Sequence, residues 1–320
     1  MSFLVTGGAG YIGSHVVHAF VTAGLSPVVI DDLSSGHAAF VPAGVPFVEG
    51  SILDTDLVRK TITDYQVTGV VHLAGFKYAG LSVARPLHTY EQNVIGTISL
   101  LTAMADGGVD QIIFSSSAAV YGTPRTALVT EQTPSDPESP YGESKLIGEW
   151  LLADQAKANG LKHTSLRYFN VVGSASPQLY DSSPHNLLPA VLDALAQGRA
   201  PRLNGDDYDT PDGTCVRDYV HVGDIAVSHV AAAKALAGGR ELEAVYNLGS
   251  GKGASNREIM IAIATATGID FQPDVMPRRA GDPARIVASG ARAARDLDWK
   301  MRHTLEDMVQ SAWQARKAVR

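Results

Sequence analysis

The chain has one cysteine, few charged residues and no long apolar run. Cys215 alone cannot form an intrachain disulfide or a cysteine-based zinc site, and no metal site is expected. The 26 basic and 33 acidic residues form no basic cluster, which argues against a nucleic-acid partner. No apolar run approaches the roughly 18 residues that a membrane span needs. The N-terminus also lacks the basic segment of a signal peptide. We therefore expect a soluble, cytoplasmic protein.

Apolar residues and glycine are plentiful, and they are arranged in a regular order. The chain has 320 residues, of which 45% are hydrophobic and 31 are glycine. Apolar runs that predict buried strands alternate with helical patterns. The expected strands are 3–5, 27–30, 70–73 and 111–114, and the expected helices are 14–23, 54–65 and 90–107. This alternation predicts an α/β fold with a Rossmann-type, doubly wound parallel sheet.

Prolines break up the chain after Tyr168 and predict a smaller second lobe. We expect the first domain to span residues 1–169, with segments from about 215–250 returning to it. Residues 170–320 then form the C-terminal lobe. Within the second half, 215–221 and 245–248 look like strands and 304–317 like a helix. Since ligands of such sheets bind beyond the carboxyl ends of the strands, functional residues should follow the strands.

A glycine-rich turn joins the first expected strand to the first expected helix. Gly7, Gly10 and Gly13 give one glycine spacing, and Gly8 begins a second, GxGxxG. Glycine allows a tight turn and close approach of a diphosphate, and the helix N-terminus favours the negative charge. Asp31 at the end of the second strand suits the ribose hydroxyls of NAD, and no arginine follows within 32–37 to favour NADP. We therefore expect NAD as cofactor.

A tyrosine and a lysine lie four residues apart at an expected helix start. Ser139 suits an N-cap and Pro140 the first helical position, so Tyr141 and Lys145 share one helix face. Tyrosine has a pKa of about 10 in water, and a nearby ammonium and a nicotinamide cation would favour the phenolate. Ser117, at the end of an upstream strand, could pass on the proton. This set predicts general-base chemistry.

Together these stretches resemble the extended branch of the short-chain dehydrogenase/reductase superfamily, and within it the UDP-glucose 4-epimerases. The resemblance rests on 6–13, on Ser115-Ser116-Ser117, and on Tyr141 with Lys145. Further matching stretches are 72–77, 93–97, 166–170, 186–189, 212–222, 246–249 and 278–282. Related dehydratases and decarboxylases carry a threonine with an acidic residue where this chain has Ser116, Ser117 and Ala118, which favours epimerisation.

The resemblance implies a role for each matching residue. The implied catalytic residues are Ser117, Tyr141 and Lys145. The implied cofactor contacts are Gly7, Gly10, Tyr11, Ile12, Gly13, Asp31, Ser51, Ile52, Leu73, Ala74, Gly75, Lys77, Gln92, Ser115, Tyr141, Lys145, Tyr168 and Phe169. The implied substrate contacts are Lys77, Ser117, Tyr141, Asn170, Asn186, Leu187, Asn204, Arg217, Arg279, Asp282 and Ile286. Ser51, Gln92 and Asn204 depart from the residue types usual in the family.

The resemblance also implies the reaction and the assembly. We expect NAD, tightly bound, to serve interconversion of UDP-galactose and UDP-glucose by C4 oxidation, rotation of the 4-keto sugar and re-reduction. A homodimer is expected. Ile286 falls where the family gates the space beside the sugar's 2-position, and its intermediate size predicts some tolerance of N-acetyl sugars. The alternatives are a 4-epimerase of another UDP-sugar (pentose, hexuronate or N-acetyl sugar) and a non-catalytic NAD-sensing regulator.

Overall fold

A sheet of seven parallel strands forms the centre of the molecule. The computed structural model describes residues 1–278 and 283–318. The strand order is β11-β6-β5-β4-β1-β2-β3, and every neighbouring pair is parallel. The strands are β1 (Ser2–Thr6), β2 (Ser26–Asp31), β3 (Phe47–Glu49), β4 (Gly69–His72), β5 (Gln111–Ser117), β6 (Lys162–Tyr168) and β11 (Val245–Leu248). The expected Rossmann-type sheet is confirmed, and residues 245–248 join it as its last strand.

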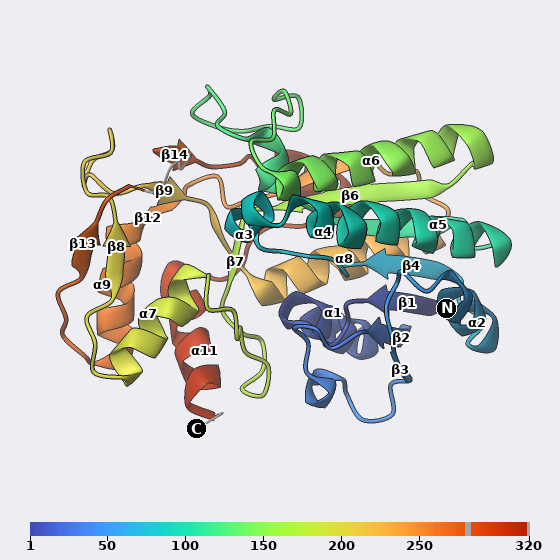
Figure 1. Ribbon diagram of the computed structural model, residues 1–320, viewed down its shortest axis with the longest axis horizontal. Helices are drawn as coiled ribbons and strands as arrows, with labels where there is room; N and C mark the ends of the chain where they lie inside the picture. Colours follow the sequence, from blue (N-terminus) through green and yellow to red (C-terminus); the bar gives the residue numbers. More distant parts are fainter. Residues whose placement is uncertain (279–282, 319–320) are drawn as a thin grey trace.

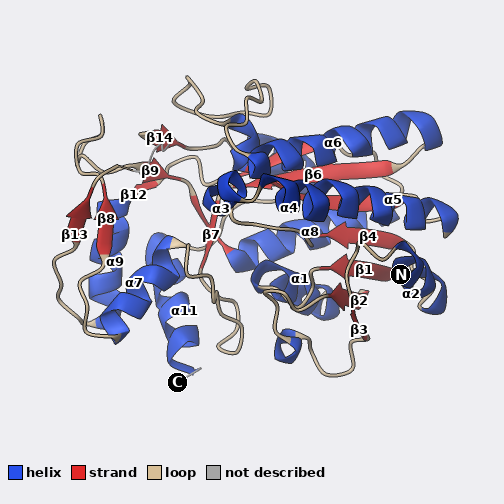
Figure 2. Cartoon of the chain, in the orientation of Figure 1, coloured by secondary structure: helices blue, strands red, loops and turns tan. Residues whose placement is uncertain are grey.

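Helices cover both faces of this sheet. Successive side chains of a strand point to opposite faces, so the apolar strands need a packed layer on each face. Leu4 packs into one core with α2 (Thr55–Asp64), α5 (Gly96–Asp106) and α6 (Pro140–Asn159). Its neighbours Phe3 and Val5 pack into the opposite core with α1 (Tyr11–Thr22) and α8 (Val222–Ala237). Figure 2 shows the helices on either side of the strands. Buried on both faces, the strands read as near-continuous apolar runs.

A smaller lobe lies at the carboxyl ends of the strands, toward which the arrows of β1 and β4 point in Figure 1. Its own core joins three helices, α7 (Leu187–Ala196), α9 (Asn256–Thr267) and α11 (Leu305–Ala318), with the strand β8 (Arg202–Asn204). The strand β13 (Asp274–Met276) pairs with β8. The remaining α-helices of the described residues are α3 (Ala79–Ala84), α4 (Pro86–Tyr90) and α10 (Ala291–Leu297). The helix expected over 304–317 is confirmed as α11.

Two expected elements are divided in the structure. The helix expected over 90–107 begins as a π-helical turn, Glu91–Ile95, that follows α4 and precedes α5. The strand expected over 215–221 is two strands, β9 (Val216–Arg217) and β10 (Tyr219–His221), which belong to different small sheets. Between them the buried carboxylate of Asp218 accepts N–H bonds from Ser250 and Ala288, at 2.7 and 3.0 Å. Both donors come from segments far along the chain, and Asp218 separates the two strands.

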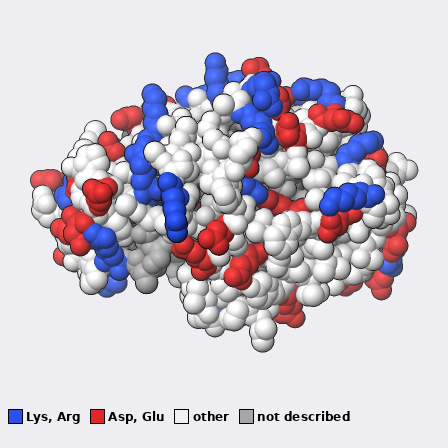
Figure 3. All heavy atoms as spheres, turned by 90° about the horizontal axis from the view of Figure 1, so that it is seen from above, with Lys and Arg blue, Asp and Glu red and all other residues white. Residues whose placement is uncertain are grey.

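The small sheets connect the lobe to the central sheet. The strand β10 pairs with β7 (Asn170–Val172), directly after β6. The strand β9 lies between β12 (Ala254–Ser255) and β14 (Arg285–Ile286). No helix in the described part of the chain is long and apolar enough to cross a membrane. Basic and acidic side chains are interspersed over the face drawn in Figure 3.

Candidate active site

The glycine-rich turn between β1 and α1 is built too closely for side chains. Gly7 has φ +70°, and a Cβ there would lie 2.7 Å from the backbone nitrogen of Ala74. A Cβ on Gly13 would lie 2.0 Å from the carbonyl oxygen of Gly7. No side chain caps α1, which begins at Tyr11. Its first N–H groups can therefore bind an anion, such as the diphosphate of a dinucleotide.

Asp31 lies at the carboxyl end of β2 beside this turn. Its two oxygens accept N–H bonds from Ala9 and Leu33, both at 2.9 Å, and the residue is 8% exposed. Burial raises the pKa of its carboxyl group, and the two N–H bonds and the Lys77 ammonium oppose that shift. Each carboxylate oxygen keeps a lone pair that can accept a ribose hydroxyl. The turn and Asp31 thus fit the two ends of an adenosine diphosphate.

Tyr141, Ser117 and Lys145 meet at the carboxyl end of β5. The hydroxyl of Tyr141 lies close enough to the Ser117 side chain for Ser117 to lower its pKa. The buried Lys145 lies one turn along α6, and its Nζ donates to the Ser115 carbonyl at 3.0 Å and lies 5.9 Å from the centroid of the Tyr141 ring. An ammonium has three donors, so Lys145 can also bind ribose hydroxyls. The helix-face pairing expected from the sequence is confirmed.

The titration of this group depends on burial. Burial raises the pKa of Tyr141, and the Ser117 side chain works against that shift. Burial also lowers the pKa of Lys145 to about 8, while the carboxylate of Glu149 opposes that shift. A cationic Lys145 and a cationic ring beside Tyr141 would both favour its phenolate. The arrangement can therefore act as a general base at near-neutral pH.

The start of α6 is fixed by several side chains. Ser139 caps it by accepting the Gly142 N–H at 3.2 Å, as the sequence predicts. Asn93 donates to the Ser144 hydroxyl at 2.8 Å and also accepts the Phe76 N–H at 2.6 Å. Asn93 therefore ties the loop after β4 to the helix that carries Tyr141. The sequence analysis assigned Asn93 no role. The structure shows that its amide is buried, and a buried amide needs hydrogen-bond partners such as these.

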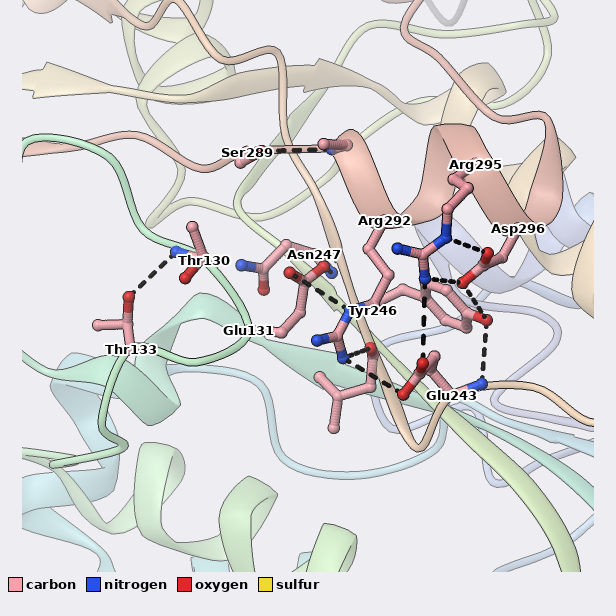
Figure 4. Close-up of polar contacts among 12 residues, drawn as sticks. Thr130, Glu131, Thr133, Glu243, Tyr246, Asn247, Ser289, Arg292, Arg295 and Asp296 are labelled. Atoms are coloured by element: carbon pink, nitrogen blue, oxygen red, sulfur yellow. Dashed lines mark hydrogen bonds and ion pairs between the residues drawn. The ribbon is translucent and has the colours of Figure 1, made fainter.

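The loop before α6 is held against β11 and α10 (Figure 4). Glu131 accepts the Asn247 N–H at 2.9 Å and pairs with Arg292 of α10 at 3.7 Å. Val129 exchanges backbone hydrogen bonds of 2.8 Å with Val287 and Ser289. The loop that leads into Tyr141 is thereby joined to the segment that follows Ile286.

The lobe contributes polar side chains to the same edge of the sheet. Arg217 of β9 is 8% exposed, and its Nη1 donates to the Val216 carbonyl at 2.8 Å. Ile286 of β14 pairs in register with Arg217 and packs against the cluster that contains Phe169. Asn186 precedes α7 and donates to Asp181 at 2.6 Å. The structure therefore places these residues on the side of the lobe next to the central sheet.

Most of the other expected residues follow the carboxyl ends of the strands. Ser51 and Ile52 follow β3, Leu73, Ala74, Gly75 and Lys77 follow β4, and Ser115, Tyr168 and Phe169 lie at the ends of β5 and β6. Gly10 and Ile12 flank the start of α1, Gln92 lies in the π-helical turn, Asn170 begins β7, Leu187 begins α7 and Asn204 ends β8. Arg279 and Asp282 lie outside the described residues. Because the strands of the central sheet are parallel, the residues that follow β3, β4, β5 and β6 meet at one edge of that sheet.

Asp181 is a residue at this edge that sequence reasoning did not select. With Tyr11 and Arg316 it lines a partly open pocket bounded by α7 and α11. Burial raises the pKa of Asp181, and the Lys77 ammonium opposes that shift. Asp181 lies in an irregular, proline-containing loop where no periodicity marks it. Only the folded chain brings it near Tyr11 and Lys77.

Known proteins are similar over the whole chain. Residues 3–249 match the NAD dependent epimerase/dehydratase family. A UDP-glucose 4-epimerase of Lactobacillus helveticus is 43% identical over 323 residues, which cover 99% of this chain and 98% of that protein. The structure of UDP-glucose 4-epimerase from Brucella ovis in complex with NAD matches with a TM-score of 0.93 and 41% identity over 97% of each chain. The UDP-Glc/GlcNAc 4-epimerase of Campylobacter jejuni matches with a TM-score of 0.86 and 35% identity over 99% of each chain. With a glycine-rich turn and a Ser-Tyr-Lys group at one edge of its sheet, this chain belongs to the NAD dependent epimerase/dehydratase family.

Proposed function

We propose that this protein is an NAD-dependent 4-epimerase that interconverts UDP-galactose and UDP-glucose. The observation that carries the proposal is the meeting of Ser117, Tyr141 and Lys145 at the sheet edge that also holds the glycine-rich turn. The names of the relatives support the substrate. On this proposal residues 1–169 hold the cofactor and residues 170–320 hold most of the UDP-sugar.

Each site residue then has a defined task. NAD, when bound, supplies a hydride acceptor and donor for C4 of the sugar. Tyr141 takes the proton of the 4-hydroxyl, Ser117 bonds the reacting oxygen, and Lys145 favours the phenolate. Arg217 and Arg279 bind the diphosphate, for which guanidinium groups are well suited. The remaining substrate contacts are the set expected from the sequence, with Ile286 beside the sugar.

Incubation with UDP-galactose tests the function. The purified protein should convert UDP-galactose to UDP-glucose without added NAD, as followed by proton NMR of the anomeric signals. A protein that binds NAD and a UDP-sugar but converts neither sugar would be the regulator that the sequence left open. Conversion of only a pentose, hexuronate or N-acetyl derivative would favour a different 4-epimerase.

The bound cofactor should be NAD rather than NADP, because the Asp31 carboxylate can accept hydrogen bonds from the ribose hydroxyls and would repel a 2′-phosphate. Denaturing the purified protein should release NAD or NADH, identified by mass spectrometry. Asp31→Ala should reduce the fraction of protein that retains the nucleotide. Asp32→Ala is the matched control, since Asp32 is exposed and its carboxylate accepts from the N–H and hydroxyl of Ser34 within its own turn. Release of mainly NADP would contradict the assignment.

Ile286 should set the tolerance for a substituent at the 2-position of the sugar. Removing a bulky side chain relieves a steric exclusion without adding an attraction. Ile286→Gly should raise kcat/KM for UDP-N-acetylglucosamine relative to UDP-glucose, and Ile286→Tyr should lower that ratio by about tenfold or more. The exposed neighbour Arg285→Ala should leave the ratio unchanged. If neither change at Ile286 alters the ratio, Ile286 is not the gate.

A second copy of this chain is the partner that we propose for an exposed apolar surface. Leu87 of α4, Ile95 before α5 and Trp150 of α6 are 83%, 54% and 57% exposed on neighbouring helices. Trp150→Glu should convert the expected homodimer to a monomer in light scattering, whereas Ile261→Glu on α9 should not. A wild-type monomer would contradict the proposal. The cytoplasmic location expected from the sequence stays a prediction.

A further inference from the structure

Glu149 is a buried carboxylate one helical turn beyond Lys145. The two residues are four apart on α6 and therefore lie on one helix face. Both are 7% exposed. A charge removed from water is costly unless it is paired and hydrogen-bonded. The residues that bind the Glu149 carboxylate therefore indicate how a buried charge is stabilised here.

Both partners of Glu149 come from the strands that carry the active site. Its Oε1 accepts from the Ser116 hydroxyl at 2.5 Å and from Nε of Arg167 at 2.8 Å, and its Oε2 accepts from Nη2 of Arg167. Ser116 lies in β5 between Ser115 and Ser117, and it pairs in register with Arg167 of β6. The carboxylate thus joins α6 to both strands directly beneath the Ser117–Tyr141–Lys145 group.

Arg167 is held in this pair from its other side. Its guanidinium carbon lies 4.8 Å from the centroid of the Tyr121 ring, and the Tyr121 hydroxyl donates to Asn247 at 2.7 Å. Although burial works against its charge, the hydrogen bonds to Glu149 raise the pKa of Arg167. Arg167 therefore stays charged, and its planar group fixes the direction of the carboxylate.

We propose that Glu149 is a positioning residue for the reaction: it locks α6 to β5 and β6 and places a fixed negative charge behind the Lys145 ammonium. This inference rests on the proposed function, since it concerns the same Ser117–Tyr141–Lys145 group. Among the described residues, no carboxylate lies within ion-pair distance of Lys145. Its ammonium instead donates to the Ser115 carbonyl and lies 4.9 Å from the Phe114 ring centroid. Glu149 is thus the acid on its own helix face that can stabilise the ammonium.

The two histidines nearest Lys145 stay uncharged near neutral pH, and burial works against ionisation of the two tyrosines beside it. Burial lowers the pKa of His72 in β4 to about 3 and that of His229 in α8 to about 4. Burial also raises the pKa of Tyr141 and of Tyr168 in β6. Burial lowers the pKa of Lys145 to about 8, and Glu149 opposes this shift. Loss of the Glu149 charge should therefore lower the pKa of Lys145, and Lys145 would lose its proton at lower pH.

The experiment measures Lys145 directly and activity separately. The protein has nine lysines, so ¹³C labelling at lysine Cε should give few signals, and Lys145→Met assigns the signal of Lys145. In the purified protein with its nucleotide, Glu149→Gln should lower the titration midpoint of Lys145 by about one pH unit. The pH at which kcat/KM falls on the alkaline side should decrease by a similar amount. If the single variant does not fold, Glu149→Gln with Arg167→Gln removes both buried charges and should give a smaller shift in the same direction, because it also removes the cation of Arg167.

Two controls separate charge from structure. Glu143→Gln removes a carboxylate from the same helix, where Glu143 bonds the Tyr90 hydroxyl, and should leave the midpoint unchanged. Ser116→Ala removes the link to β5 but keeps the Glu149 charge, so it should also leave the midpoint unchanged. A purely structural role would lower thermal stability in Glu149→Gln without moving the midpoint, and that result overturns the proposal. A shifted midpoint in a protein that does not epimerise UDP-galactose would instead reject the proposed function.

Discussion

Replacing Tyr141 by phenylalanine is expected to lower kcat by ~10²–10⁴-fold, the loss typical when a general base is removed. The variant keeps the ring that fills the site and loses only the hydroxyl beside Ser117. Bound NAD should therefore be retained, and KM should change much less than kcat. The measurement is turnover of UDP-galactose, with the nucleotide content of each preparation determined after denaturation.

Tyr90→Phe is the matched control for this prediction. The Tyr90 hydroxyl bonds to Glu143 at the outer side of α6. The same chemical change there should leave kcat near the wild-type value. If Tyr141→Phe turned over near the wild-type rate, another group would have to accept the proton, and the assigned base would be wrong.

Replacing Gly13 by alanine is expected to abolish retention of the cofactor and with it the activity without added NAD. The new Cβ would lie 2.0 Å from the Gly7 carbonyl oxygen and 2.9 Å from the Gly8 Cα, both of them backbone atoms that cannot move independently. The helix α1 must then shift away from the turn, which displaces the N–H groups that face the diphosphate. Overpacking of this kind costs about 1–3 kcal/mol, so the melting temperature should fall as well.

Gly80→Ala is the control for the Gly13 variant. A Cβ on Gly80 meets no atom within 4 Å, and its φ is not positive, so the same substitution in α3 should leave nucleotide content and stability unchanged. Retention of the wild-type amount of nucleotide by Gly13→Ala would show that the close contact between the turn and α1 does not matter for binding.

Patterns local to the sequence are enough to predict the architecture and the central features of the candidate site. Apolar runs mark strands and a period of 3.6 marks helices, because local periodicity decides which face of an element can be buried. The turn over 7–13 and the pair Tyr141 and Lys145 could be identified for the same reason, since their geometry follows from spacing within one element. Parallel strands then bring the residues that follow them to one edge.

The distant side chains that support that edge are visible only in the folded chain. Asp218 divides an apparently continuous strand because it accepts N–H bonds from residues about 30 and 70 positions further along the chain. Glu149 meets Arg167, and Glu131 meets Asn247, across separate elements. Each contact satisfies a buried polar group, a requirement that burial creates and that leaves no period in the sequence. The partner of a buried charge is therefore fixed only when strands and helices pack together.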